Sequence, residues 1–270
     1  MPNSVARTAF TAVALALATL VITALLGEGM LRLKNSTGEN YVIEMWRYAK
    51  ELKHISPNPD LGHVHVAGAT AHLQGVDFAL NSLGMRGPEP VPNSATGKTV
   101  LLLGNSITLG WGVAENDTLR ARLQDGLGAE FQVMNGGIGN YNTRRAVTLF
   151  REQWRAAVRP DVVVVHFFLN DAEYLPPSHD NILMRNSQLA VTLYYLAQGV
   201  LKGSSDMSAL IAHYRDVYRP EAKGYREMIG ALDELSQMSK QDGFRVVFSM
   251  IPDIHRLESY PFAFAHQQMR

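Results

Sequence analysis

The pattern of apolar and polar positions divides this chain into an N-terminal apolar run, a polar intermediate segment and a long region of alternating strands and helices. The apolar run covers residues 9–26, contains no charged residue and is apolar on every face of a helix. A helix of that kind is buried or spans a membrane, and spanning needs about 20 such residues. We therefore predict that residues 1–34 form an N-terminal transmembrane anchor or signal segment.

A cleaved signal peptide is the alternative interpretation of the same run. Signal peptidase sites place small residues in an A-x-A spacing, whereas this run ends in VITALLGEG. The missing cleavage pattern favours an uncleaved anchor. Both interpretations export the rest of the chain, so we predict a membrane-anchored protein with its main domain on the outer, periplasmic or extracytoplasmic side.

The segment 35–98 is rich in Pro, Gly, Asn and His, and we interpret it as a stalk and entry segment. It contains one amphipathic stretch at about 41–52. Residues 76–80 predict a short strand that ends at the turn residues Asn81-Ser82-Leu83-Gly84.

From residue 99 onward, short apolar runs alternate with longer amphipathic stretches. Buried strands are predicted at residues 99–103, 131–134, 161–168 and 245–251. Helices are predicted at about residues 117–127, 143–158, 187–201, 208–218 and 222–241. For the first helix, Asp117 or Asn116 is the expected N-cap. This order predicts an α/β fold, a flavodoxin-like three-layer sandwich with a mostly parallel central sheet.

Composition and charge narrow the possible functions. The 25 Lys and Arg residues balance the 25 Asp and Glu residues. The sequence has no basic stripe of the kind that would indicate a nucleic-acid partner, and none is predicted. The chain has no cysteine, which excludes disulfides, thiolate catalysis and cysteine–zinc sites. The pair His63 and His65 could share one strand face, but no third metal ligand accompanies it in the sequence.

Chemically informative residues directly follow the first three predicted strands of this region. Gly104-Asn105-Ser106 follows the first strand, Asn135-Gly136-Gly137 the second and Asn170-Asp171 the third. Ligand sites in such folds lie at the carboxyl ends of the strands. A hydroxyl, a glycine-rich loop and a carboxamide at one sheet edge are the groups that acyl transfer requires, because they supply a nucleophile and N–H donors for an oxyanion.

These segments resemble the first three sequence blocks of the SGNH/GDSL hydrolase superfamily, in the same order. Gly104-Asn105-Ser106 with the following Thr-x-Gly-x-Gly-Val is similar to block one, Asn135-Gly136-Gly137 with Tyr141 to block two, and Phe168-Leu169-Asn170-Asp171 to block three. The segment 81–87 is similar to the lead-in of membrane-anchored bacterial members. The resemblance covers most of residues 80–255.

The resemblance implies that Ser106 is the catalytic nucleophile of a serine esterase. It also implies an oxyanion hole formed by the backbone N–H groups of Ser106 and Gly137 and the side-chain amide of Asn170, with no cofactor and no metal. Two positions depart from the family pattern. Asn105 replaces the usual Asp, and Phe168 replaces the usual Gly of block three, which would narrow the pocket wall.

The general base that the family carries in a C-terminal D-x-x-H block has no counterpart after Ser106. We therefore expect the domain at 99–270 to be C-terminally incomplete. His255, in the sequence Asp253-Ile254-His255, is the candidate base, and His179 and His266 are weaker ones. His166 is expected to be a buried strand residue.

The expected function is hydrolysis of carboxylic O-acyl esters, for example acetyl esters on envelope or extracellular carbohydrate. The expected partners are such a small-molecule or carbohydrate substrate and the membrane. Two alternatives remain open: an O-acyltransferase that uses the same acyl-enzyme, and a catalytically damaged, membrane-tethered binding or accessory module. A dinucleotide fold is disfavoured because the glycine loop lacks its third glycine and its acidic partner.

Overall fold

The computed structural model describes residues 2–36, 40–91, 97–179, 181–202 and 206–270. The chain folds into two compact units. The first unit contains Met1–Arg47 and Asp180–Gly203, and the second contains Tyr48–His179 and Ser204–Arg270. The predicted boundaries at 34/35 and 98/99 stay a prediction.

The first unit is helical. Helix α1 (Pro2–Asn35) includes the predicted apolar run, and its segment Arg7–Asn35 is long and apolar enough to cross a membrane. Helices α7 (Ile182–Asn186) and α8 (Gln188–Lys202) follow later in the chain, and α8 packs against α1. Helix α2 (Tyr41–Glu51) begins in this unit and ends in the second one.

Two small antiparallel sheets precede the main sheet of the second unit. Strand β1 (Lys53–Ile55) pairs with β2 (His63–His65). Strand β3 (Thr70–Leu73) pairs with β4 (Val76–Ala79), which is the strand predicted at 76–80. The part of segment 35–98 that the structure describes thus contains α2 and two small sheets.

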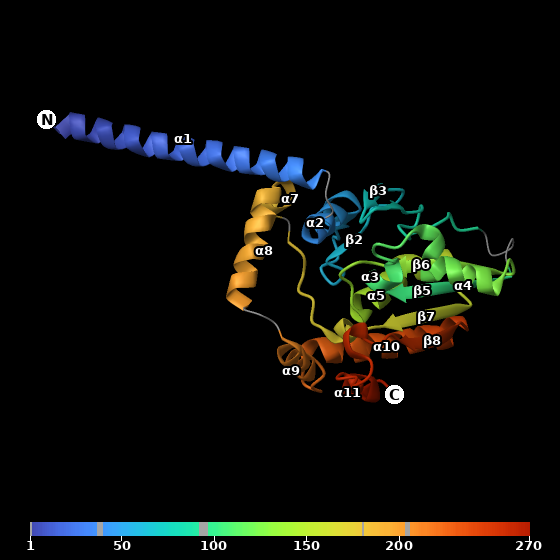
Figure 1. Ribbon diagram of the computed structural model, residues 1–270. Coiled ribbons are helices and arrows are strands. Elements are labelled where there is room, and N and C mark those ends of the chain that lie inside the picture. The colour runs from blue at the N-terminus through green and yellow to red at the C-terminus, as the bar shows by residue number, and fades with distance from the viewer. Residues whose placement is uncertain (1, 37–39, 92–96, 180, 203–205) are drawn as a thin grey trace. The chain divides into compact units, whose positions relative to one another are not determined.

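The main sheet consists of four parallel strands in the order β6-β5-β7-β8 (Figure 1). Their bounds are β5 Lys98–Gly104, β6 Phe131–Gly137, β7 Val162–Phe167 and β8 Arg245–Met250. All four lie where the apolar runs predict them. Because the strands are parallel, the loops that follow them gather at one edge of the sheet.

Alternate residues of the strands form two apolar layers, as expected for a sheet covered on both faces. On one face, Leu101 and Val163 pack with residues of the helices after β6 and before β8. On the other face, Leu102 and Val164 pack near Leu123. The three-layer α/β fold class is therefore confirmed.

The predicted helices around the sheet lie close to their expected positions, whereas the short helices Ser106–Leu109 and Ala263–Gln268 were not predicted. Their bounds are α3 Ser106–Leu109, α4 Leu119–Leu127, α5 Thr143–Leu149, α6 Arg155–Val158, α9 Met207–Val217, α10 Lys223–Asp242 and α11 Ala263–Gln268. Between α5 and α6 the predicted helix 143–158 contains a π-helical turn, Phe150–Trp154.

The predicted N-cap of the first helix was wrong. Asn116 and Asp117 lie in a 3-10 turn, Glu115–Asp117, and α4 begins after it. Thr118 is the N-cap because its hydroxyl accepts a hydrogen bond from the backbone N–H of Ala121 at 3.2 Å.

Candidate active site

The candidate nucleophile Ser106 is the first residue of α3, directly after β5. Asn105 is the N-cap of this short helix, and its Oδ1 accepts the backbone N–H of Ile107 at 2.9 Å. The first N–H groups of a helix have no acceptor within the helix. Ser106 is partly exposed, and neither its hydroxyl nor its N–H has a hydrogen-bond partner among the described residues. Both groups are therefore available to a substrate.

The side chain of Asn105 also orients Asn170, the candidate oxyanion donor. Its Nδ2 donates to Oδ1 of Asn170 at 3.0 Å. Oδ1 of Asn105 is already engaged by Ile107, so only Nδ2 can face Asn170. The carbonyl oxygen of Asn170 is thereby fixed, which leaves its own Nδ2 free to donate elsewhere. The structure thus brings Ser106 and Asn170 together through the residue that departs from the family pattern.

Asp171 holds the turn that carries Asn170. Its Oδ2 accepts the backbone N–H of Phe168 at 2.6 Å, and its side chain is buried. Burial raises the pKa of this carboxyl to about 7, although the hydrogen bond from Phe168 acts in the opposite direction. Phe168 itself packs on the cluster around Phe167, away from the residues that line the cavity described below.

Gly137, the second predicted backbone donor, lies at the end of β6 opposite Gly104 of β5. A Cβ atom at this position would lie within 3 Å of the backbone of Thr108 and Leu109, so only glycine allows α3 to approach. Its N–H is buried and donates to Oδ1 of Asn135 at 3.0 Å. The position next to α3 is as expected, but this amide is already hydrogen-bonded within the protein.

A residue that the sequence analysis did not single out, Asn140, offers a free amide in the same turn. The N–H groups of Ile138, Gly139 and Tyr141 all have acceptors, whereas that of Asn140 has none among the described residues. Asn140 is exposed and has a left-handed backbone conformation, with φ of 64°. Asn tolerates this conformation better than most residues. The sequence signal was the Asn-Tyr pair after a glycine run, which is typical of a turn.

Buried polar side chains hold Gly139, next to Asn140, on both sides of its peptide. The hydroxyl of Tyr48 accepts its N–H at 2.8 Å, and Nζ of Lys53 donates to its carbonyl oxygen at 3.2 Å. Burial lowers the pKa of Lys53 from 10.5 to about 7. The residues before the main sheet therefore help to shape the turn beside the candidate site.

The pair His63 and His65 has a structural explanation. Burial lowers the pKa of both imidazoles, to about 2 and about 3. Nε2 of His65 is hydrogen-bonded to the hydroxyl of Tyr48 at 2.7 Å, and Nδ1 is hydrogen-bonded to the carbonyl oxygen of Gly84 at 2.7 Å. Its two ring nitrogens are thus used in packing the turn.

The loop after α3 is held by Arg86, from the segment that resembles the family lead-in. Its guanidinium is buried and donates to the carbonyl oxygens of Leu109, Gly110 and Val113 at 3.1, 2.6 and 2.7 Å. Nε also lies 3.2 Å from a carboxylate oxygen of Glu115. Arg86 is therefore a positioning residue for the nucleophile loop.

His255, the candidate base, lies in the loop after β8, at the same edge of the sheet. Its Nδ1 is 2.9 Å from Oδ1 of Asp253, which is buried, while the imidazole is largely exposed. This arrangement leaves Nε2 available and orients the ring as a carboxylate orients a catalytic histidine. No hydrogen bond joins His255 to Ser106 in the described part of the chain. His166 is buried in β7 as expected.

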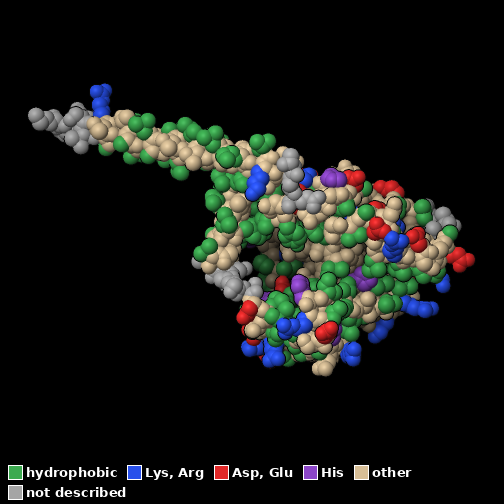
Figure 2. All heavy atoms as spheres, viewed as in Figure 1, with side chains coloured by type: hydrophobic (Ala, Val, Ile, Leu, Met, Phe, Trp, Pro, Cys, Tyr) green, Lys and Arg blue, Asp and Glu red, His purple; other side chains and the backbone are tan. Residues whose placement is uncertain are grey.

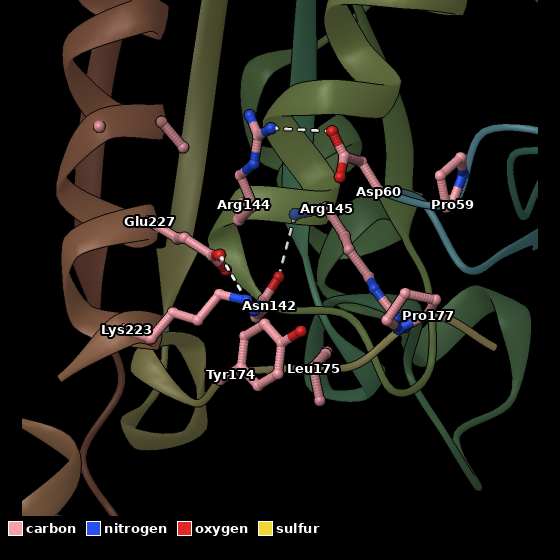
Figure 3. Close-up of a pocket in the computed structure, with 12 residues that line it drawn as sticks. Pro59, Asp60, Asn142, Arg144, Arg145, Tyr174, Leu175, Pro177, Lys223 and Glu227 are labelled. Carbon is pink, nitrogen blue, oxygen red and sulfur yellow. Dashed lines mark hydrogen bonds and ion pairs between the residues drawn. The ribbon is translucent and has the colours of Figure 1, made fainter.

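A cavity of about 400 Å³ opens beside the start of α5 (Figure 3). It is lined by Pro59, Asp60, Asn142, Arg144, Arg145, Tyr174, Leu175, Pro177, Lys223, Glu227, Gly230 and Ala231. Charged side chains face it in opposed pairs, Arg144 with Asp60 at 3.1 Å and Lys223 with Glu227 at 3.9 Å. Ser106, Gly137 and Asn170 are not among its lining residues.

Comparisons with solved structures return esterases at low identity. An acetylxylan esterase from Geobacillus stearothermophilus is 13% identical, with 56% of this chain and 76% of that chain covered and a TM-score of 0.24. A carbohydrate acetylesterase family member from Sinorhizobium meliloti is 15% identical, with 56% and 82% covered and a TM-score of 0.28. The SGNH-hydrolase family esterase AlinE4 is 15% identical, with 64% and 95% covered and a TM-score of 0.25. No curated protein matches the chain.

The profile of the GDSL-like lipase/acylhydrolase family matches residues 102–257. That range is more than half of the chain and contains Ser106, the glycine-rich turn, Asn170 and the loop of His255. The chain therefore belongs to the GDSL-like lipase/acylhydrolase family, within the SGNH/GDSL hydrolase superfamily.

Proposed function

We propose that this protein is a serine esterase that hydrolyses carboxylic O-acyl esters with Ser106 as its nucleophile. The observation that carries the proposal is the partly exposed Ser106, with its hydroxyl and N–H unoccupied, beside an Asn170 whose carboxamide is fixed by Asn105. A serine placed next to preorganised N–H donors is what acyl transfer requires.

The proposed reaction has two steps. Oγ of Ser106 attacks the ester carbonyl carbon and gives its proton to a base, and the carbonyl oxygen becomes an oxyanion. The tetrahedral intermediate collapses to an acyl-serine and releases the alcohol, which takes up that proton. Water then attacks the acyl-serine, and the carboxylic acid leaves as Ser106 recovers its proton.

The oxyanion donors in this proposal are the N–H of Ser106 and Nδ2 of Asn170, together with one amide of the turn 137–141. Gly137 was expected to supply that amide. Because its N–H is hydrogen-bonded to Asn135, we assign the third donor to Asn140, whose amide is exposed and unoccupied.

We propose His255 as the base, oriented by Asp253. The support is the Nδ1 contact to the carboxylate and the position of this loop at the carboxyl edge of the sheet. His255 shares no hydrogen bond with Ser106 among the described residues, so its imidazole must move to act on Ser106. This requirement is also what favours the alternative of a binding module without catalysis.

The proposed substrate class is a short O-acyl group, such as acetyl, on a carbohydrate. The cavity beside α5, which Ser106, Gly137 and Asn170 do not line, has charged and polar walls that would suit the hydroxyl-rich part of such a substrate better than a long alkyl chain. We further propose that α1 is an uncleaved membrane anchor that holds the domain on the outer side of the membrane. The length and apolarity of its segment Arg7–Asn35 support a spanning helix.

The deciding experiment measures turnover of p-nitrophenyl acetate by the full chain and by Ser106→Ala. We expect the variant to lose about a thousandfold or more in rate, because the residual donors alone give little acceleration. Ser82→Ala, which changes an exposed serine outside the site, is the matched control. Equal rates for Ser106→Ala and the parent would remove the esterase proposal in favour of the binding module.

The base is tested with His255→Ala and Asp253→Asn. We expect His255→Ala to approach the rate of Ser106→Ala. An unchanged rate removes His255 from the reaction. Product analysis with added monosaccharide then separates hydrolysis from acyl transfer, because a transferase forms the sugar ester instead of the free acid.

A further inference from the structure

Helix α8 has a row of strongly exposed apolar side chains. No charged residue occurs between Ser187 and Leu201. Leu193, Leu196 and Val200 recur at helical spacing and are 56%, 61% and 84% exposed. Positions three, four and seven apart lie on one face of a helix. An apolar stripe of this kind indicates contact with a partner or a lipid surface.

The opposite face of the same helix is mainly polar, although the buried Val191 also lies on it. Gln188 and Gln198 lie away from the stripe at helical spacing, and Thr192 and Tyr195 flank them. On the neighbouring helix α7, Ile182 and Leu183 are also strongly exposed. The helix is therefore amphipathic, and its apolar residues Leu193, Leu196 and Val200 are exposed.

The start of α8 is hydrogen-bonded to the side chain of Glu28 in α1. The two carboxylate oxygens accept the backbone N–H groups of Gln188 and Leu189 at 3.1 and 2.8 Å, and the hydroxyl of Ser187 at 2.9 Å. A carboxylate at the first turn of a helix satisfies N–H groups that otherwise have no acceptor and interacts favourably with the helix dipole.

Two further hydrogen bonds join α1 to the residues at the start of α8. Arg32 donates to the carbonyl oxygen of Asn186 at 2.9 Å, and Asn35 donates to the side chain of Gln188 at 2.8 Å. The side chain of Leu189 also lies beside Gly27 of α1. The positions 28, 32 and 35 follow directly after the apolar run at 9–26, so α8 starts where that run ends.

The direction and length of α8 fit a helix that lies on the membrane rather than one that crosses it. In Figure 1, α8 runs across the direction of α1 instead of alongside it. Figure 2 shows hydrophobic side chains along both helices. The 15 residues of α8 extend about 22 Å, which is short of the roughly 30 Å hydrocarbon core. The paired Tyr194 and Tyr195 suit the boundary between lipid and water.

We propose that α8 is an interfacial helix whose stripe Leu193, Leu196 and Val200 inserts into the surface of the bilayer that α1 spans. The occupant of this apolar face is thus lipid. The inference rests on the proposed anchoring by α1. It adds that α8 lies in the membrane plane. The Glu28 contacts hold the start of α8 at the end of the spanning run, and α8 runs across the direction of α1. Moving α8 out of the membrane plane would therefore break these contacts.

The test uses the absence of native cysteines, which permits single-cysteine variants of the full chain. Leu196→Cys probes the stripe, and Gln198→Cys probes the opposite face of the same helix. Leu17→Cys probes α1, and Gln153→Cys, an exposed position of the second unit, is a reference in water. Each variant is labelled with an environment-sensitive fluorophore and reconstituted into phosphatidylethanolamine–phosphatidylglycerol vesicles that contain a spin-labelled phosphatidylcholine quencher.

We expect strong quenching at positions 17 and 196, at least about twofold more than at positions 198 and 153, since interfacial helices bury only their apolar face. Quenching at 17 with equal, weak quenching at 196 and 198 would overturn the interfacial helix and leave the anchor standing. No quenching at 17 would overturn both. Disulfide-linked dimers of Leu196→Cys with no lipid quenching would show that a second copy covers the stripe, which also overturns the proposal.

Discussion

At the residue scale, Asn105 shows how one amide can serve two elements. Its oxygen caps α3, and its nitrogen fixes the carbonyl of Asn170. A carboxylate at this position could accept the N–H of Ile107 but could not donate to Oδ1 of Asn170. Asn170 would then have to turn its Nδ2 toward the carboxylate. The replacement of the usual Asp therefore leaves both N–H groups of Asn170 Nδ2 available to substrate, whereas a carboxylate would engage one of them.

The first residue-scale prediction concerns that donor. Asn170→Ala should lower kcat for p-nitrophenyl acetate about 10²–10³-fold with little change in KM, because the donor acts mainly on the oxyanion. Steady-state kinetics on the full chain measure both constants. A rise in KM at unchanged kcat would assign Asn170 to substrate binding instead.

The second residue-scale prediction follows from Lys53. Its pKa is about 7 in the folded protein and near 10.5 when unfolded, so the unfolded chain binds more protons between these values. The free energy of unfolding should therefore rise as the pH increases from 7 to 10.5. The stability that is present above pH 10.5 should be lost as the pH falls to 7, and below pH 7 both states carry the proton.

The matched variant Lys53→Met keeps the length of the side chain but cannot titrate. Denaturant unfolding of both proteins at several pH values gives the difference in stability. We expect the free energy of unfolding of the variant, relative to that of the parent, to be highest at pH 7 and below. This difference should decrease as the pH approaches 10.5. A difference that does not change with pH would contradict the lowered pKa.

At the element scale, the approach of α3 to the end of β6 decides the shape of the site. Gly137 provides the space, Arg86 holds the following loop, and Tyr48 and Lys53 hold the peptide of Gly139. These contacts come from segments that are distant in the sequence. The site is therefore built by the packing of several loops on one sheet edge.

The element-scale prediction is that Gly137→Ala destabilises the protein by about 1–3 kcal/mol, the usual cost of overpacking a tight contact. The new methyl group would push α3 away from β6 and lower esterase activity with it. Gly126→Ala is the control, because nothing lies within 4 Å of a Cβ atom at that position in α4. Thermal unfolding and activity of both variants provide the comparison, and equal behaviour would contradict the packing argument.

At the scale of the whole molecule, the chain joins an apolar helix to an α/β unit of the GDSL family. The segment Arg7–Asn35 has a mean hydropathy of 2.4 over its most apolar window, and none of that window is buried within the protein. A helix exposed in this way is stable in lipid and unfavourable in water.

The whole-molecule prediction is that the full chain remains in the membrane fraction after alkaline carbonate extraction. Leu17→Arg combined with Val21→Arg should weaken this association, since an arginine near the centre of a spanning helix costs about 2.5–3.5 kcal/mol. Gln153→Arg, outside the helix, controls for added charge. Extraction of the unsubstituted chain by carbonate would contradict an uncleaved anchor.

The sequence alone determined the strands, most helices and the family of this protein. Apolar runs of strand length mark buried strands because each face of the sheet is covered, and the residues that follow them are conspicuous in the sequence. This local information placed Ser106, Gly137 and Asn170 at one sheet edge, where the structure has them.

Only the tertiary structure decided which groups are available for chemistry. The amide of Gly137 is occupied by Asn135 and that of Asn140 has no acceptor among the described residues, a difference that depends on side-chain packing and leaves no mark in the spacing of residues. Likewise, the contact between Glu28 and α8 joins positions about 160 apart in the chain. Periodicity describes each helix separately, whereas the hydrogen bonds that join two helices exist only once the chain has folded.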